Sequence, residues 1–326
     1  GRRAADKLYQ AFPEKFYYVP MTECKDANEF LETGKHEKLM WAARSPQRYT
    51  PENFFCSDAD VEAAIKNENP YEYVPTGHTG LDEKIRGMVK GGLTFIKAPR
   101  GTGKTEVIRY FETGLLRDED SRVALLHMEE MKSTTYRAMA TYELGWNVRT
   151  KEDAVAVGYT EEQVISAAQK MAGGENTVIF EMQSHDDPMQ LLEYVRLAST
   201  VYGAEFIFID HVQRLAYLSN SGVDAATSTL TTLGSRMAQL AKELNIGVVF
   251  ISQVNDDGRT KYAASLEEEA ICCIKLSRNT ESEDEVERNT THFTVDKNRP
   301  FAKLGSAGSV YYDPETTILE EVVFQV

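Results

Sequence analysis

The stretch Leu93-Thr-Phe-Ile-Lys-Ala98-Pro-Arg-Gly101-Thr-Gly103-Lys104-Thr105-Glu106 decides the fold of this chain of 326 residues. Its first part is β-branched and aromatic, its middle is rich in glycine, and residues 107–111 continue as a helical stretch. A strand, a glycine-rich turn and a helix in this order are the context that a phosphate-binding loop needs. Glycine lets backbone N–H groups turn inward around phosphate oxygens, and the start of the helix adds the positive end of its dipole. The stretch therefore predicts a nucleoside triphosphate site.

Two side chains of this loop have predicted roles in binding. Lys104 is expected to neutralise the terminal phosphates, and the hydroxyl of Thr105 to ligate Mg²⁺. Ala98 stands where such loops begin with glycine, which the loop tolerates if the φ angle of Ala98 is negative. A glycine-rich turn that binds nothing is the alternative, and the flanking strand and helix disfavour it. The loop residues expected to bind the nucleotide are Ala98, Arg100, Gly101, Thr102, Gly103, Lys104 and Thr105.

Composition limits the possible classes of protein. The chain has 36 basic and 51 acidic residues, a net charge of −15, which argues against a protein that coats nucleic acid. It leaves room for an acidic ring whose basic loops touch DNA only at its centre. No apolar run approaches the ~18 residues of a membrane span, and no signal-peptide pattern opens the chain. The four cysteines lack C-x-x-C spacing, so neither a disulfide framework nor a zinc site is indicated, and a reducing cytoplasm is expected.

The length predicts about two domains. Residues 1–44 have a helix–strand–helix pattern, in which Asp26 can cap the second helix and Gly34 can end it. Residues 45–76 are polar and rich in Pro and Asn, which indicates a linker; its one short helix, around Val61 and Ile65, has too little apolar surface to stand alone and is expected to dock on a neighbouring subunit.

From residue 77 to residue 326, strands and helices alternate, which predicts an α/β domain with a mainly parallel sheet covered by helices. Further strands are expected at 122–128, 177–182, 205–210 and 247–252, long helices at 191–202 and 225–244, and shorter, partly antiparallel strands at 270–276, 291–297 and 309–312. The charge run at 281–288 is interpreted as a solvated loop or hairpin turn.

Polar residues follow several of these strands at their carboxyl ends, where an open parallel sheet binds its ligands. Asp210 is expected to orient magnesium-bound water, with a helix cap as the alternative. Glu129 is the first candidate for the carboxylate that positions and polarises the attacking water, and Glu130 is the second; either one is otherwise a surface acid. Gln253 is placed to hydrogen-bond the γ-phosphate or its water, or else is a solvated amide.

Two further sets of residues carry positive charge. The polar loop that follows Gln253 contains Arg259 and Lys261, which are candidates for contacts with DNA phosphates, although two aspartates dilute the charge. Lys297 and Arg299 lie on one side of a strand, two residues apart. A cation offered to a neighbour's γ-phosphate would stabilise developing charge, and two solvated cations on an edge strand are the alternative.

Taken together, the chain resembles the helicase part of a phage bifunctional primase–helicase, within the RecA-like ring helicases that include the bacterial and mitochondrial replicative helicases. The motifs that carry this resemblance occur in order along the chain: Gly80-Leu81-Asp82 with the loop through Thr105, the catalytic-glutamate motif Met128-Glu129-Glu130, the Walker B motif Ile209-Asp210-His211, the sensor motif Ile251-Ser252-Gln253, and the K-x-R motif Lys297-Asn298-Arg299. Residues 1–44 resemble the final part of the family's Toprim primase domain, so that its carboxylates and zinc module would precede Gly1 and no primer synthesis is expected.

The resemblance implies a RecA-like P-loop NTPase that forms a hexamer, uses Mg²⁺ with ATP or dTTP, moves 5′-to-3′ on single-stranded DNA and unwinds duplex. It implies that Arg299 acts on the nucleotide of a neighbouring subunit, that Lys297 assists it, and that Arg278 and Tyr312 grip the base by stacking. It also implies that the loop with Asn255, Arg259 and Lys261 lines the DNA channel. DNA polymerase and primase are the implied partners, in the cytoplasm, or the host cytoplasm if a phage encodes the protein.

Two departures from the family pattern and two other functions remain open. Gln253 stands where phage relatives have histidine, and in this it resembles the bacterial helicases. The loop after it is short and acidic. A RecA-like recombinase, or a nucleotide-gated assembly protein that binds DNA without unwinding it, is the main alternative. A metabolic P-loop kinase is disfavoured by the pair Lys297 and Arg299 and by the lack of an acceptor-site motif.

Overall fold

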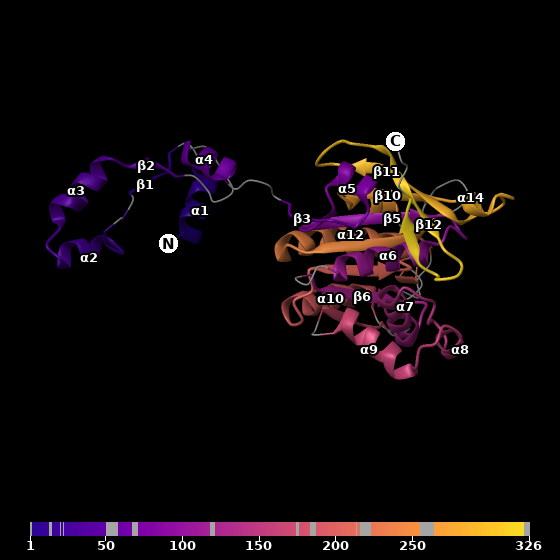
Figure 1. Ribbon diagram of the computed structural model, residues 1–326. Helices are drawn as coiled ribbons and strands as arrows, with labels where there is room; N and C mark the ends of the chain where they lie inside the picture. Colours follow the sequence, from indigo (N-terminus) through magenta and orange to yellow (C-terminus); the bar gives the residue numbers. More distant parts are fainter. Residues whose placement is uncertain are drawn as a thin grey trace. The chain divides into compact units, whose positions relative to one another are not determined.

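The computed structural model describes residues 2–12, 15–19, 21, 23–49, 58–66, 71–117, 121–173, 176–182, 187–212, 214–215, 223–254 and 264–322 (Figure 1). The chain divides into two compact units, Gly1–Asn69 and Pro70–Val326. Among the described residues, no helix has the length and apolar character that a bilayer span requires.

The first unit is small and mostly helical. Its elements are α1 (Arg2–Ala11), β1 (Tyr17–Tyr18), α2 (Ala27–Glu32), α3 (His36–Arg44), β2 (Gln47–Arg48) and α4 (Asp58–Lys66), with β1 antiparallel to β2. Asp26 caps α2 as the sequence predicts, because its carboxylate accepts the backbone N–H of Glu29 at 3.0 Å. The short linker helix is confirmed as α4, and it exposes the apolar side chains of Val61 and Ile65.

The second unit is built on a nine-strand sheet, with the strand order β13-β12-β11-β10-β5-β9-β8-β6-β7. The strands are β5 (Gly92–Ala98), β6 (Val123–His127), β7 (Thr177–Ile179), β8 (Phe206–Asp210), β9 (Gly247–Gln253), β10 (Cys272–Ser277), β11 (Thr290–Asn298), β12 (Gly305–Tyr312) and β13 (Leu319–Glu321). The six strands from β10 to β7 are parallel, whereas β11, β12 and β13 extend one side as an antiparallel run. This arrangement confirms the mainly parallel sheet and its partly antiparallel tail. A separate antiparallel pair joins β3 (Tyr73–Val74) to β4 (Met88–Val89).

Helices cover both faces of the sheet (Figure 1). The helices of this unit are α5 (Thr79–Ile85), α6 (Lys104–Leu116), α7 (Lys132–Leu144), α8 (Lys151–Ala156), α9 (Glu161–Ala172), the 3₁₀ turn η1 (Pro188–Gln190), α10 (Leu191–Thr200), α12 (Val223–Leu244), α13 (Ala264–Glu269) and α14 (Glu285–Asn289). Alternate residues of one strand therefore enter different cores. Phe95 packs with α10 and α12, and its neighbour Ile96 packs with α5 and α6. Burial on both faces explains why the parallel strands are almost continuously apolar.

Two parts of the second unit differ from the sequence-based expectation. The charge run at 281–288 is not simply a loop or turn, because it contains α14, which the Asp284 carboxylate caps by accepting the N–H groups of Val286 and Glu287. The run connects the antiparallel neighbours β10 and β11 and is mostly exposed, so the interpretation as a solvated hairpin connection is confirmed, with a short helix in its second half. Helices α7, α8 and α9 form a lobe after β6 with a small core of its own, including Ala140, Val148 and Val164.

Candidate active site

The phosphate-binding loop has the backbone that the sequence predicts. All seven residues of β5 are buried, and Ala98, which ends the strand, does not have a positive φ angle. The two glycines do, with φ angles of 77° at Gly101 and 79° at Gly103, a region that L side chains rarely adopt. Gly103 is also the N-cap of α6, so the helix that follows begins at Lys104.

Side chains from inside and outside the loop hold its shape. The hydroxyl of Thr102 donates to the carbonyl of Pro99 at 2.8 Å, and the hydroxyl of Thr291 in β11 donates to the carbonyl of Thr102 at 3.1 Å. Thr102 is therefore buried as part of the loop's framework and is not among the cavity-lining residues.

A cavity of about 480 Å³ opens beside the loop, at the carboxyl ends of β5, β6, β8 and β9. Three residues predicted from separate strand ends, Glu129, Asp210 and Gln253, meet there with Lys104 and Thr105. The full lining is Pro99, Arg100, Gly101, Gly103, Lys104, Thr105, Glu106, His127, Glu129, Glu130, Asp210, His211 and Gln253.

Lys104 is balanced by residues at the end of β8. Its Nζ lies 2.9 Å from Oδ1 of Asp210 and donates to Nδ1 of His211 at 3.2 Å. His211 has a φ angle of 72°. Burial and the charge of Lys104 lower the pKa of the His211 imidazole, so the ring is neutral near pH 7 and its Nδ1 can accept this hydrogen bond.

The donor set of the cavity fits Mg²⁺. Asp210 is 9% exposed, and its Oδ1 lies 2.9 Å from Nζ of Lys104. A buried carboxylate held by a cation that phosphates can also bind, with the hydroxyl residue Thr105 lining the same cavity, matches the oxygen ligands that Mg²⁺ prefers. Within the described ranges, no cluster of three or more His, Cys, Asp or Glu is arranged to hold a metal by itself, so phosphate and water oxygens would complete the coordination.

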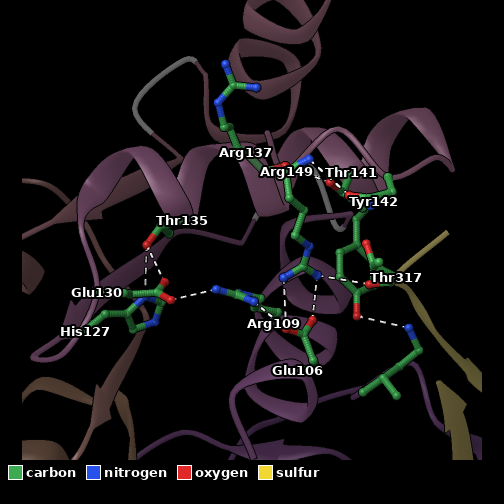
Figure 2. Close-up of polar contacts among 12 residues, drawn as sticks. Glu106, Arg109, His127, Glu130, Thr135, Arg137, Thr141, Tyr142, Arg149 and Thr317 are labelled. Carbon is green, nitrogen blue, oxygen red and sulfur yellow. Dashed lines mark hydrogen bonds and ion pairs between the residues drawn. The ribbon is translucent and has the colours of Figure 1, made fainter. Parts of the chain in front are cut away.

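Glu129 and Glu130 follow β6 directly, but their surroundings are different. The side chain of Glu129 is 53% exposed, and its Oε2 lies 3.1 Å from Nδ1 of His211. Glu130 is engaged on both carboxylate oxygens. Its Oε1 accepts from Nδ1 of His127 at 2.9 Å and from the hydroxyl of Thr135 at 2.7 Å, and its Oε2 accepts from Nη2 of Arg109 at 2.6 Å (Figure 2).

These contacts explain the acidity of Glu130. Burial favours the neutral acid, but the hydrogen bond from His127, the charges of Arg109 and His127 and the hydrogen bond from Thr135 outweigh it and lower the pKa of Glu130 to about 2. Glu130 is therefore ionised near pH 7 and hydrogen-bonded on both oxygens, whereas Glu129, which lines the same cavity, is more exposed and lies beside His211.

Behind this turn lies a charged network that the sequence analysis missed. Arg149, between α7 and α8, donates from its Nη1 and Nη2 to the two carboxylate oxygens of Glu106, at 2.8 and 2.5 Å, and from Nη2 to the carbonyl of Thr317 at 3.0 Å (Figure 2). Arg109 also donates to Glu106. The only local signal was the spacing of Glu106 and Arg109, three residues apart on one helix. The partners Arg149 and Thr317 are distant in sequence, so no local pattern indicated their contacts with Glu106.

Because of His127, the stability of the fold is expected to fall as the pH rises into the alkaline range. Burial opposes protonation, but Glu112 at 2.7 Å and Glu130 raise the pKa of His127 from 6.5 to about 10. The imidazolium thus stabilises the fold fully below pH 6.5, and this stabilisation is lost as the pH rises through 10. Urea unfolding of the native protein and of His127→Gln should therefore show a difference in the free energy of unfolding that shrinks over that interval. A difference that is constant with pH would contradict the protonated state.

Lys297 and Arg299 lie away from the cavity of their own chain. Lys297 Nζ donates to the carbonyls of Glu267 and Glu268, at 2.9 and 2.7 Å, and Arg299 Nη2 donates to the carbonyl of Glu268 at 2.7 Å. Both cations therefore bind the last turn of α13, where the helix dipole is negative.

The backbone fixes where Arg299 stands on the sheet. The N–H of Arg299 donates to the carbonyl of Ile271, whose own N–H donates to the carbonyl of Leu93. Arg299 is thus level with the amino end of β5, and five residues at ~3.3 Å each, about 17 Å, separate Leu93 from Ala98 at the loop. An extended arginine side chain does not span that distance.

Arg278 and Tyr312 adjoin the loop but are not among the residues that line the cavity. Arg278 donates to the carbonyl of Arg288 and, at 2.8 Å, to Oδ1 of Asn289; burial lowers the pKa of Arg278. A side chain added at Gly103 would come within 3.3 Å of Nη1 of Arg278. Tyr312 ends β12, and burial raises the pKa of its phenol. The DNA-contact candidates Asn255, Arg259 and Lys261 lie outside the described residues.

Comparison with known proteins agrees with this geometry. The profile of the DnaB-like helicase C-terminal domain matches residues 73–313. No curated protein sequence matches the chain. A solved ATPase domain is similar at 20% identity with a TM-score of 0.64, over 81% of this chain and 97% of its own. A solved DnaB-like replicative helicase, studied with its interactions with primase, is similar at 18% identity with a TM-score of 0.64, over 98% of this chain and 75% of its own.

A KaiC-like protein from the archaeon Pyrococcus horikoshii is similar at 16% identity with a TM-score of 0.55, over 78% of this chain and 100% of its own. These three likenesses show the fold, a RecA-like α/β domain with a mostly parallel sheet between helices. The profile match covers well over half of the chain and includes the loop, the strand ends and Lys297 with Arg299. The chain belongs to the family of DnaB-like helicase C-terminal domains.

Proposed function

We propose that this protein is the motor of a replicative DNA helicase, which hydrolyses ATP or dTTP with Mg²⁺ and moves 5′-to-3′ on single-stranded DNA to unwind duplex. The observation that carries the proposal is the cavity beside the loop, where Lys104, Asp210 and Glu129 meet in a member of a helicase family. A glycine-rich loop alone would equally suit a kinase, whereas an acid at the end of β6 facing the cavity suits hydrolysis.

The residues of the cavity have separate proposed roles. The loop N–H groups and Lys104 bind and neutralise the phosphates, and Thr105 with Asp210 holds Mg²⁺, which when bound offsets phosphate charge. Glu129 orients the attacking water and takes its proton, for which a carboxylate that is 53% exposed and lines the cavity is suited. Gln253 hydrogen-bonds the γ-phosphate or its water. Arg278 and Tyr312 hold the base.

A second copy of the chain is proposed to complete the site. Arg299 is too far from its own cavity to act there, and its guanidinium would stabilise the charge that develops on a neighbour's γ-phosphate, with Lys297 beside it. We propose a closed hexamer in which α4 docks its exposed Val61 and Ile65 on the next subunit. In this assembly the loop with Asn255, Arg259 and Lys261 faces the DNA in the central channel.

The wider setting is proposed from the resemblance to phage-type primase–helicases. Residues 1–44 would be part of a Toprim primase domain, 45–76 the linker and 77–326 the motor. Primase is a proposed partner because a structurally similar replicative helicase is described with its interactions with primase. A replicative DNA polymerase is the second proposed partner, in the host cytoplasm if a phage encodes the protein.

Single-stranded DNA is expected to stimulate nucleotide hydrolysis by about tenfold or more, a typical size for coupling between two sites. Phosphate release is measured with Mg²⁺ and each nucleotide, with and without an oligonucleotide, and the assembly is sized by light scattering under the same conditions. A forked duplex with a 5′ tail should be unwound, and one with only a 3′ tail should not. Unstimulated hydrolysis by a monomer would contradict the proposal, and filaments on DNA without unwinding would favour a recombinase-like protein.

A further inference from the structure

The turn Met128–Glu130 is held from two sides. On one side, Nη1 of Arg214, which follows β8, donates to the carbonyl of Met128 at 2.8 Å. On the other side, the carboxylate of Glu130 accepts hydrogen bonds from Arg109, His127 and Thr135 (Figure 2). Glu129 lies between these two attachments, and its Oε2 lies 3.1 Å from Nδ1 of His211.

The Glu130 contacts are rigid because they are buried and balanced in charge. Arg109 is 5% exposed and Glu112 is 1% exposed. His127 donates its two ring N–H groups to Glu130 and Glu112, so the ring cannot rotate without breaking a hydrogen bond. Breaking such a group would leave a buried charge without its partner, which is strongly unfavourable.

The same contacts tie the turn to the phosphate-binding loop. The guanidinium of Arg109 divides its donors between Glu130 and Glu106, and both Arg109 and Glu106 lie on α6, which begins at Lys104. These contacts therefore fix the turn after β6 relative to α6, the helix that starts at the loop, as well as relative to the sheet.

From this arrangement we infer that Glu130 is a positioning residue for hydrolysis, which fixes the turn so that Glu129 faces the γ-phosphate. This inference rests on the proposed function and deepens it. A small displacement of a reacting group lowers a rate by about 10²-fold, so a fixed turn has a measurable effect. Glu130 does not act as the base itself, because both of its oxygens are occupied and a carboxylate with a pKa of about 2 accepts a proton poorly.

Glu130→Gln tests the inference, because it keeps the shape of the side chain and removes its charge. We expect kcat for nucleotide hydrolysis to fall about 10- to 100-fold, with KM and nucleotide affinity unchanged. The matched control is Glu143→Gln on α7, which removes an exposed ion pair with Lys170 and should leave kcat at the native value. Thermal melting and light scattering establish that each variant is folded and assembled.

The double variant Glu129→Gln/Glu130→Gln separates positioning from a merely structural role. If Glu130 acts through Glu129, the double variant hydrolyses nucleotide no more slowly than Glu129→Gln alone. A structural role would instead lower nucleotide affinity and the residual rate further. If Glu130→Gln does not fold, Thr135→Val decides, because it removes only one donor to Glu130 and should lower kcat a few-fold at constant KM.

Three results would overturn the inference. Glu130→Gln with native kcat, while Glu129→Gln is inactive, removes the positioning role and leaves the proposed function standing. If Glu130→Gln is inactive and Glu129→Gln is active, Glu130 is the catalytic acid and Glu129 is not. Failure of the native protein to hydrolyse any nucleotide, with or without DNA, overturns the proposed function and this inference together.

Discussion

Arg299→Ala is expected to lower nucleotide turnover by about 10³- to 10⁵-fold, the usual effect of a missing arginine finger, while nucleotide binding remains measurable. The guanidinium of Arg299 is bound to the carbonyl of Glu268, at the amino end of the sheet and about 17 Å of strand away from its own loop. The substitution therefore leaves the cavity beside the loop, the proposed nucleotide site, intact. It removes a cation that we place in the site of the next subunit, where negative charge develops in the transition state.

Lys303→Ala is the matched control for this prediction. Lys303 lies four residues further along the chain, and its ammonium likewise donates to a backbone carbonyl, that of Glu83 at 3.2 Å. Its loss should leave turnover near the native value. Mixing Arg299→Ala with Glu129→Gln should restore part of the activity, because some interfaces then combine an intact acid with an intact arginine. Native turnover by Arg299→Ala, or mixtures as inactive as their components, would rule out a shared site.

Lys104→Ala is expected to reduce turnover by about 10³-fold or more and to weaken nucleotide binding as well. Lys104 Nζ is the cation next to Asp210 and His211 in the cavity, and it begins the helix that follows the loop. Its removal takes away a donor to the phosphates and leaves the buried carboxylate of Asp210 without its counter-ion. Binding is measured by titration with a fluorescent nucleotide, and turnover by phosphate release.

Thermal melting with Mg²⁺ and a non-hydrolysable nucleotide measures nucleotide binding by the same variant in a second way. Ligand that binds only the folded state raises the melting temperature, so the native protein should be stabilised and Lys104→Ala should not. Lys132→Ala, in the exposed first turn of α7, is the control and should respond to nucleotide as the native protein does. Nucleotide binding by Lys104→Ala at native affinity would show that the phosphates lie elsewhere.

The elements around the nucleotide were predictable because their signals are local. The run into Ala98 is apolar and β-branched, the two glycines permit positive φ angles, and the parallel strands β6, β8 and β9 have similar apolar runs. Because parallel strands end at the same edge, the residues after them meet in one cavity, and Glu129, Asp210 and Gln253 do so. Their roles in hydrolysis stay predictions.

The interactions that join distant parts of the chain were not predictable. Lys97 lies next to the end of the apolar run, yet it is buried, with its Nζ 2.6 Å from Glu267 and 3.0 Å from Asp296, two acids from other elements. Arg149 reaches Glu106 and Thr317 in the same way. A single sequence contains no periodic pattern for such pairs, since they depend on how helices and strands pack. For the same reason it could not separate Glu129 from Glu130, whose difference lies entirely in their neighbours.

The distance between the loop and Arg299 has a consequence for the assembly proposed above. If Arg299 of one copy serves the loop of the next, the acceptor surface lies at one end of the sheet and the donor at the other. Each contact would then join two different surfaces, and the interface would be heterologous. A dimer with two-fold symmetry would bury one surface twice and leave both sites without their arginine. Head-to-tail contacts would instead give every copy one neighbour on each side, so the direction of the proposed ring would be set by the polarity of the sheet in each copy.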